Sequence, residues 1–194
     1  MATEIVKSAR ADDKAAAIAV LTLAFASDPA TRWTWPDPMA YLAAFPRFAE
    51  AFGGAAFAKG SAHCIEGAAA ALWLPPGIHP DEEGMLELFQ ATADPATAGD
   101  GPQVMQQMAS YHPREPHWYL PLIGVDPARQ GQGLGSRLLE YAARLFDRDG
   151  VVAYLESSNP RNIPVYRRHG FEVLGRIQVG GSPVFTPMRR DPVA

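Results

Sequence analysis

A glycine-rich stretch in the second half of the sequence has the residue types of a turn that binds an anion. The stretch runs from Gln130 to Ser136 with the sequence QGQGLGS, between an apolar run ending at Val125 and a helical pattern beginning at Leu134. Glycines allow positive φ angles and let a ligand approach the backbone closely. The first amides of a helix have no partner within the helix, and together with the helix dipole they attract negative charge. The pattern therefore predicts a site for an anion such as a pyrophosphate, with Arg129 adding positive charge.

Other interpretations of the same glycines are open. A turn of this kind can simply pack a helix on a sheet, although each glycine costs a helix roughly 0.5–1 kcal/mol relative to alanine, which favours a functional role. The Walker loop of a nucleoside triphosphatase ends in Gly-Lys-Ser or Gly-Lys-Thr, and this stretch has no lysine. A dinucleotide-binding loop has the spacing GxGxxG and a later acidic residue. The spacing here is GxGxG, and although Glu156 ends the following strand, too few strand–helix units follow to build such a sheet.

The elements around the turn are predicted from hydrophobic periodicity and from residues that end helices. Apolar residues recur on one face of a helix from Leu134 to Asp149, which Gly150 ends. The run from Val151 to Leu155 is apolar enough for a short buried strand. Before this helix and strand, the sequence predicts a strand at Trp118–Val125 and a turn at Asp126–Gly133. After them it predicts a helix that starts within Asn159–Pro164 and ends at Gly170, and two final strands at Phe171–Val179 and Val184–Met188.

The first half of the sequence is expected to hold helices and a hairpin. A short first strand is predicted at residues 3–9, and Asp12 or Asp13 can cap the helix that follows it. The stretch Asp28–Pro38, with two tryptophans and three prolines, is predicted to be a loop. The remaining expected elements are a helix at Pro38–Phe52, paired strands at 61–66 and 68–74, and, within an irregular substrate-side segment at 76–116, short helices at 81–92 and 102–111.

Length, charge and cysteine content limit the classes of function. A chain of 194 residues can bury a large core, and we treat residues 1–194 as a single domain. The net charge of −4 argues against nucleic acid as a partner, since phosphate backbones require a basic face. Cys64 alone cannot form a disulfide within the chain, and the histidines lack metal-ligand spacing, so no metal is expected. The charged N-terminus and the shortness of the apolar runs predict a cytoplasmic protein without a membrane partner.

The glycine-rich turn and a second motif together resemble the GNAT acyltransferase superfamily. Its first signature, Q/R-x-x-G-x-G/A between the fourth strand and the next helix, is matched by residues 130–135. Its second signature is an asparagine-containing helix start followed by a tyrosine and then Gly-Phe, and residues 159–171 match it with NPRNIPVYRRHGF. Within the superfamily the chain resembles the puromycin N-acetyltransferase branch, through the stretches 24–32, 72–76 and 117–120.

This resemblance implies a fold and a cosubstrate. The fold is mixed α/β, with a six- to seven-stranded, mostly antiparallel sheet whose central parallel strands splay apart between flanking helices. Acetyl-CoA would bind in that gap, with its pantetheine amides against the fourth strand and its pyrophosphate on the glycine-rich turn. The residues implied to bind it are Ile123, Val125, Gln130, Gly131, Gln132, Gly133, Leu134, Gly135, Ser136, and Asn159 or Asn162.

The resemblance also implies chemistry for two residues. After an amine attacks the thioester, the departing thiolate needs a proton, and Tyr166 is expected to supply it, an effect worth roughly 10²–10⁴ in rate. The alternative is that Tyr166 is a buried aromatic beside Phe171. Glu156 is the first candidate for the base that removes the amine's proton, or it pairs with Arg161. Transfer would be direct within a ternary complex, because no cysteine is placed as a nucleophile.

The acceptor implied by the resemblance is a primary amine of a small molecule. In the puromycin N-acetyltransferase branch the acceptor loop lies between the first two helices, where Asp28 could hold an ammonium group and Trp33 and Trp35 could bind an apolar acceptor. Equally, the two tryptophans could pin this loop to the core. A protein or peptide acceptor and a catalytically silent acetyl-CoA-binding module are the alternatives, and an exposed final strand could pair two subunits into a homodimer.

Overall fold

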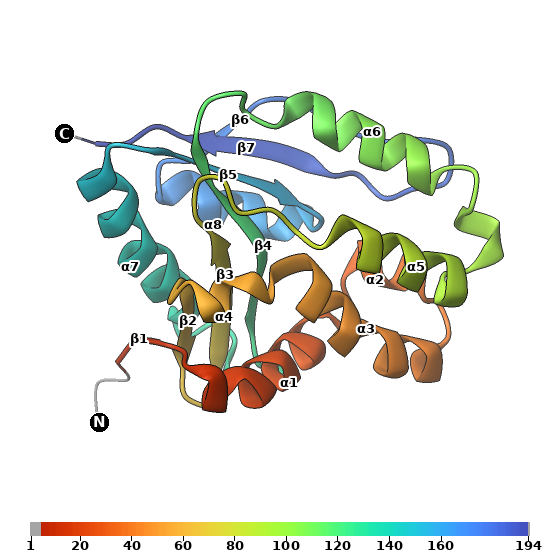
Figure 1. Cartoon of the computed structure of the whole chain (residues 1–194), viewed down its shortest axis with the longest axis horizontal. Coiled ribbons are helices and arrows are strands. Elements are labelled where there is room, and N and C mark those ends of the chain that lie inside the picture. Colours follow the sequence, from red (N-terminus) through yellow and green to blue (C-terminus); the bar gives the residue numbers. More distant parts are fainter. Residues whose placement is uncertain (1–4, 194) are drawn as a thin grey trace.

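The computed structural model describes residues 5–193, with helices on both faces of one seven-stranded sheet of order β1-β2-β3-β4-β5-β7-β6 (Figure 1). This confirms the predicted mixed α/β fold. No helix among the described residues is long and apolar enough to cross a bilayer. The strands are β1 (Lys7–Ser8), β2 (Ala62–Ile65), β3 (Ala69–Leu74), β4 (His117–Val125), β5 (Val152–Ser157), β6 (Glu172–Val173) and β7 (Thr186–Arg190). The helices are α1 (Lys14–Phe25), α2 (Pro29–Thr34), α3 (Pro38–Gly53), α4 (Ala55–Ala58), α5 (Glu82–Thr92), α6 (Gly101–Tyr111), α7 (Leu134–Asp149) and α8 (Ile163–Arg168).

The first strand lies partly outside the part of the chain that the structure describes. It was predicted at residues 3–9, of which residues 3 and 4 are not described, and the pairing that is seen is confined to β1. The hairpin of β2 and β3, the helices α5 and α6 and the long helix α7 all lie where the sequence predicts them.

The central strands β4 and β5 are the only parallel neighbours among the described strands, and they separate along their length. They pair from His117 with Val152 as far as Tyr119 with Tyr154. Beyond that point β4 stays paired with β3 up to Val125, whereas β5 stays paired with β7. The splay implied by the resemblance to the GNAT superfamily is therefore confirmed, and the gap opens at the carboxyl ends of both strands.

Alternation along the strands divides the apolar side chains into two cores, one on each face of the sheet. In β3, Leu72 belongs to the core formed with α1 and α3, and its neighbour Trp73 belongs to the core formed with α7 and α8. Both are fully buried, which confirms β3 as a buried strand. In β5, Tyr154 and Leu155 divide between the two cores in the same way.

Residues 28–38, predicted to be a loop, contain the helix α2. Asp28 caps this helix, because its Oδ1 accepts hydrogen bonds from the amides of Ala30 at 2.9 Å and Thr31 at 3.5 Å. Pro29 occupies the first helical position, where its missing N–H group is not needed. The prediction was wrong here because it treated proline only as a residue that ends helices.

The final two strands differ in length from the prediction. Within residues 171–179 only Glu172–Val173 forms a strand with β7, and β7 itself extends to Arg190. After β6 the regular ladder is interrupted, although Ile177 still forms an antiparallel bridge with Phe185. Between these two paired stretches the chain packs on α6, where a Cβ at Gly175 would come within 2.3 Å of the Tyr111 hydroxyl.

An ion pair between a buried guanidinium and a half-buried carboxylate ties the end of β7 to α7. The guanidinium of Arg190, a residue that is 5% exposed, donates hydrogen bonds of 2.7 and 2.9 Å to the carboxylate of Asp147. These bonds hold the pKa of Asp147 below its ordinary value. The contribution of the pair to stability is therefore complete above about pH 4 and is lost as the pH falls through the folded-state pKa.

We expect Asp147→Ala to lower the free energy of unfolding by about 2–3 kcal/mol, because it leaves a buried guanidinium without its anion. Urea denaturation followed by circular dichroism measures the change. Asp149→Ala is the matched control, since Asp149 pairs with the exposed Arg148 at the same end of α7, and it should change the free energy by less than about 0.5 kcal/mol. Equal effects of the two substitutions would contradict the role assigned to burial.

Candidate active site

The glycine-rich turn leaves the start of α7 open to a ligand. Gly131 and Gly133 have φ angles of 76° and 78°, in the left-handed region that favours glycine, and a Cβ on either would meet no heavy atom within 4 Å. Gly133 is the N-cap residue and has no side chain to cap α7. The amides of Leu134, Gly135 and Ser136 at the start of the helix are therefore not satisfied by a capping side chain. Positive φ, a helix N-terminus and open space coincide, as an anion site requires.

Two side-chain contacts hold this turn in place. Nε2 of Gln130 donates a hydrogen bond to the carbonyl oxygen of Val125 at 3.3 Å, and Nε of Arg129 donates one to Oε1 of Gln132 at 3.2 Å. The first contact links the turn to the end of β4. It fixes the start of α7 relative to the edge of the gap between the strands.

A small cavity of about 40 Å³ lies where β4 and β5 separate. Its lining comes from α1, β4, β5 and the start of α8, and it includes Phe25, Ile123, Glu156, Ser158, Asn162 and Tyr166. Four predicted site residues that are distant in sequence therefore share one cavity. Asn159, the other predicted asparagine, instead accepts a hydrogen bond from the amide of Arg161 at 3.1 Å and caps a short turn before α8.

Tyr166 lies on α8 beside this cavity and is 6% exposed. Its ring packs edge-on against Phe171, with 6.1 Å between the ring centroids. Burial raises the pKa of Tyr166 well above its ordinary value, and the charge of Asp28 adds to this effect. The phenol therefore keeps its proton at neutral pH, as a general acid must.

Glu156 reaches the cavity from the face of the sheet opposite to that of Tyr166. Side chains at 154 and 156 share one face of β5, and Tyr154 belongs to the core formed with α1 and α3, whereas Tyr166 belongs to the opposite core. The cavity therefore passes between the two strands, with a carboxyl group on one side and a phenol on the other. The Glu156 side chain is 2% exposed, and its Oε1 has no aligned hydrogen bond from any described residue. A buried carboxyl group with one oxygen that accepts no aligned hydrogen bond suits a base.

The neighbour of Glu156 is His112, not Arg161 as the alternative interpretation of the sequence expected. Nε2 of His112 lies 3.2 Å from Oε1 of Glu156, close enough for an ion pair although not aligned as a hydrogen bond. Burial, with Glu156 as a further cause, raises the pKa of Tyr119 and Tyr154 beside them. No motif or periodicity in the sequence marks His112, which follows α6 in the segment predicted to be irregular.

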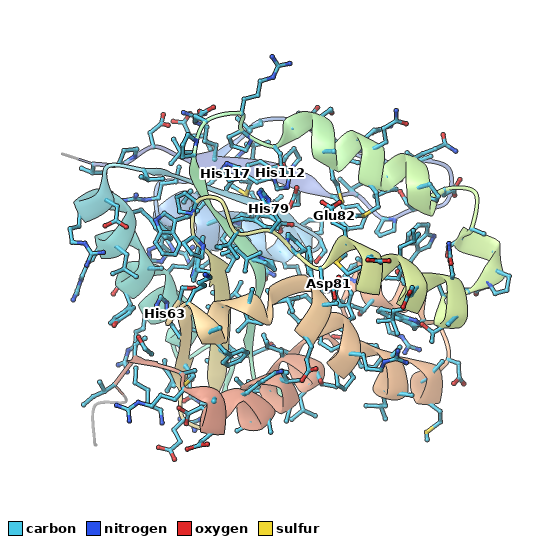
Figure 2. All side chains as sticks on the ribbon, in the orientation of Figure 1. His63, His79, Asp81, Glu82, His112 and His117 are labelled. Carbon is cyan, nitrogen blue, oxygen red and sulfur yellow. The ribbon has the colours of Figure 1, made fainter. Side chains whose placement is uncertain are left out.

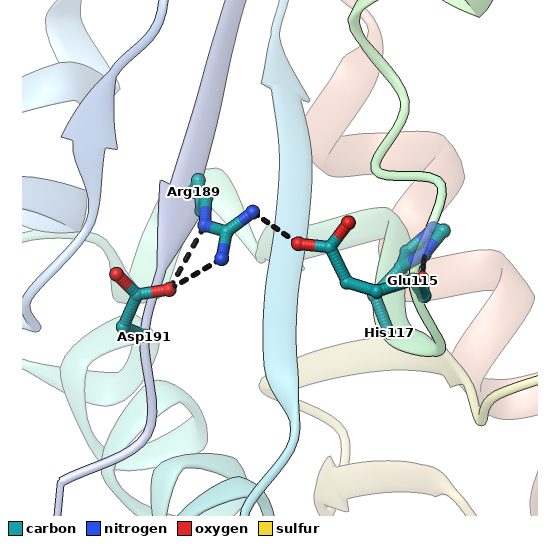
Figure 3. A network of polar contacts seen from close by, with 4 residues as sticks. All are labelled: Glu115, His117, Arg189 and Asp191. Atoms are coloured by element: carbon teal, nitrogen blue, oxygen red, sulfur yellow. Dashed lines mark hydrogen bonds and ion pairs between the residues drawn. The ribbon is translucent and has the colours of Figure 1, made fainter.

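The connection from α6 to β4 carries His112 and is anchored to the last strand by charged residues (Figure 3). Arg189 of β7 forms ion pairs with Glu115 and Asp191, and Nδ1 of His117 lies 2.9 Å from the carbonyl oxygen of Glu115. His112 and His117 lie side by side in Figure 2, with 5.5 Å between their ring centroids. Within residues 5–193 no cluster of three His, Cys, Asp or Glu side chains could hold a metal ion.

The three predicted acceptor residues have different surroundings. Asp28 is 6% exposed, and its Oδ2 accepts a hydrogen bond of 2.7 Å from the Ser158 hydroxyl, which ties the start of α2 to the cavity lining. Burial raises its pKa. Trp35 is 2% exposed, and its Nε1 donates to Oγ1 of Thr92 at 3.0 Å, so its contacts are those of a core residue that pins this region. Trp33 is half-buried on α2 and is not among the described residues that line the cavity.

Comparison with known proteins identifies the family. The model of the acetyltransferase (GNAT) family matches residues 68–171, more than half of the chain, so the chain belongs to the GNAT family. The chain is similar to a crystal structure of histone acetyltransferase HPA2 and related acetyltransferase from Corynebacterium glutamicum. The two superpose with a TM-score of 0.67 at 25% identity, over 97% of this chain and 96% of that one. A mosquito arylalkylamine N-acetyltransferase like 5b shares the fold, with a TM-score of 0.59 at 11% identity over 96% of this chain and 99% of that one.

Sequence similarity to curated proteins is confined to part of the chain. The N-alpha-acetyltransferase RimI of Mycobacterium tuberculosis is 45% identical over 75 residues, which cover 36% of this chain and 46% of that protein. The chain spans less than half the length of three curated relatives that it matches, this one included. GNAT acetyltransferases use acetyl-CoA as acetyl donor, and the open helix start at Gly133 fits the pyrophosphate of such a ligand.

We expect Gly133→Trp to abolish the rise in melting temperature that saturating acetyl-CoA should cause in the wild-type protein. An indole at this position fills the space in front of α7, and its backbone is strained at positive φ. Differential scanning fluorimetry with and without acetyl-CoA measures the effect. Gly150→Trp is the matched control, because Gly150 has a φ of 63° at the other end of α7. Stabilisation by acetyl-CoA should survive in the control, and its survival in Gly133→Trp would contradict the anion site.

Proposed function

We propose that this protein is an acetyl-CoA-dependent N-acetyltransferase that moves the acetyl group directly to a primary amine of a small molecule. The observation that carries the proposal is the cavity between β4 and β5. It has Glu156 on one side and Tyr166 on the other, and β4, which contributes Ile123 to its lining, leads into the turn before the open start of α7. A module that only bound acetyl-CoA would have no use for a buried carboxyl group and a phenol on the two sides of the same cavity.

The chain offers groups for each part of acetyl-CoA, which when bound supplies the thioester that the amine attacks. Backbone amides from Gly131 to Ser136 would hold the pyrophosphate through charge-assisted hydrogen bonds worth roughly 1.5–3 kcal/mol each. The edge of β4 around Ile123 and Val125 is not paired with β5, and it would hold the pantetheine arm. Asn162 lines the cavity from the α8 side.

Glu156 and Tyr166 have complementary tasks in this proposal. Glu156 takes a proton from the ammonium form of the acceptor, and the neutral amine then attacks the carbonyl carbon. Tyr166 donates a proton to the sulfur that leaves as the carbon–sulfur bond breaks, and the amine supplies the proton that restores the phenol. Cys64 lies in β2 and is not among the described residues that line the cavity, which supports direct transfer without an acyl-cysteine.

A small acceptor is favoured by the contact that Glu156 makes outside the cavity. His112, the residue after α6, lies against the Glu156 carboxyl group and would restrict an extended peptide on this side. The sequence resemblance to the puromycin N-acetyltransferase branch supports the same acceptor class. Asp28, through Ser158, and Trp33 stay candidates for acceptor contacts at the α2 side. A protein α-amino group is the second candidate, because of the similarity to RimI.

An acceptor panel tests the proposal. Arylalkylamines, aliphatic amines, aminonucleosides and peptides with free N-termini are incubated with acetyl-CoA, and free thiol is measured. We expect release of thiol with one or more of the small amines and little release with peptides. Release with peptides alone would replace the small acceptor by a protein, and no release with any amine would contradict an acetyltransferase.

We expect Tyr166→Phe to lower kcat roughly 100-fold or more, because the leaving thiolate loses its proton donor. Stabilisation by acetyl-CoA should be retained, since the ring and its packing on Phe171 stay in place. Tyr141→Phe removes a hydroxyl from a half-buried tyrosine of α7 whose ring contacts His63, and it should keep the wild-type kcat. An unchanged kcat in Tyr166→Phe would exclude Tyr166 from the mechanism.

A further inference from the structure

We infer that His112 carries the acceptor's proton from Glu156 to solvent in each turnover. The inference rests on the proposed function and adds a residue that acts through the base. His112 is thus a positioning and relay residue, while Glu156 remains the group that contacts the amine.

The proposed reaction releases one proton for every acetyl group that is transferred. An ammonium acceptor loses a first proton to become the attacking amine, and it loses a second when the carbon–nitrogen bond forms and the carbon–sulfur bond breaks. The second proton balances the leaving thiolate, which it reaches through Tyr166 to give the free thiol. The first proton has no place in the amide or the thiol and has to leave the protein.

Glu156 is poorly placed to release that proton by itself. Its side chain is 2% exposed, and in the proposed complex the amine would lie between it and the small cavity that it lines. A carboxyl group that stayed protonated could not accept a proton from the next amine. A base that is buried in this way needs a neighbour that passes protons on.

His112 is placed to be that neighbour. Its Nε2 lies 3.2 Å from Oε1 of Glu156, while 32% of its side chain is exposed. The imidazole packs against both Tyr119 and Tyr154, with ring centroids 4.7 and 4.6 Å away, at the position labelled in Figure 2. Imidazole can accept a proton on one ring nitrogen and release one from the other. One nitrogen of His112 can therefore take a proton from the carboxyl group while the other releases one to solvent.

The other titratable groups around His112 are less suited to this task. Burial raises the pKa of both Tyr119 and Tyr154, so neither phenol becomes a base. His117 has its pKa lowered, first by burial, and its Nδ1 faces the Glu115 carbonyl oxygen. The further group on this side is the phenol of Tyr111, which ends α6.

The relay is tested by steady-state kinetics with an amine that the wild type acetylates. Four proteins are compared: the wild type, His112→Gln, Glu156→Gln and the double variant. We expect His112→Gln to lower kcat/KM about 10- to 100-fold at neutral pH. Its stabilisation by acetyl-CoA and its urea unfolding should match the wild type. Because His112 acts through Glu156, adding His112→Gln to Glu156→Gln should cause no further loss.

Chemical rescue separates a proton relay from a packing role. His112→Ala leaves a space beside Glu156, and added imidazole should restore part of the lost rate by taking the proton in place of the missing ring. His79→Ala is the control, because His79 is an exposed histidine of the same segment. It should keep the wild-type rate with or without imidazole.

The outcomes distinguish the two proposals. Wild-type rates in both His112 variants would overturn the relay and leave the acetyltransferase proposal intact. A loss that persists on top of Glu156→Gln and is not restored by imidazole would also overturn the relay, since that pattern is the signature of a packing defect. Absence of turnover by the wild type with every amine would overturn both proposals.

Discussion

β4 and β5 stop pairing after Tyr119 and Tyr154, and the site depends on this separation. Parallel strands that are bonded along their full length leave no room between their backbones for a ligand. Here each strand keeps its outer partner, β3 for β4 and β7 for β5, so the sheet opens in the middle without an unsupported strand. The gap exposes a backbone edge of β4 and connects the two faces of the sheet.

The positions of Tyr166 and Glu156, the proposed acid and base, follow from that opening and from the alternation of side chains in β5. Glu156 shares its face with Tyr154, and Tyr166 comes from a helix packed on the opposite face. In an unbroken sheet these two groups would be insulated from one another by the strands. The gap lets both reach one cavity while remaining on different sides of it, so that a proton can be accepted on one side and donated on the other.

Prediction from sequence succeeded where the deciding interactions are local. The boundaries of α7 follow from its apolar face and from glycines at both ends, and the anion turn follows from glycine conformation and unpaired helix amides. It failed at α2, where the capping carboxylate of Asp28 outweighs the helix-breaking tendency assigned to Pro29. It also assigned no role to Ser158, because the bond from this side chain to Asp28 joins two segments that only the fold brings together.

The sequence by itself determined the family motifs, the turn that can hold a pyrophosphate and the two candidates for proton transfer, because each depends on residue types at short, fixed spacings. The tertiary structure decided which of the flanking residues face that chemistry. It buried Trp35 between α3 and α5, and it brought His112 against Glu156. Burial and contacts of this kind depend on how α6, β4 and β5 pack together, and no local pattern in the chain encodes the distance between residues that meet only in the folded state.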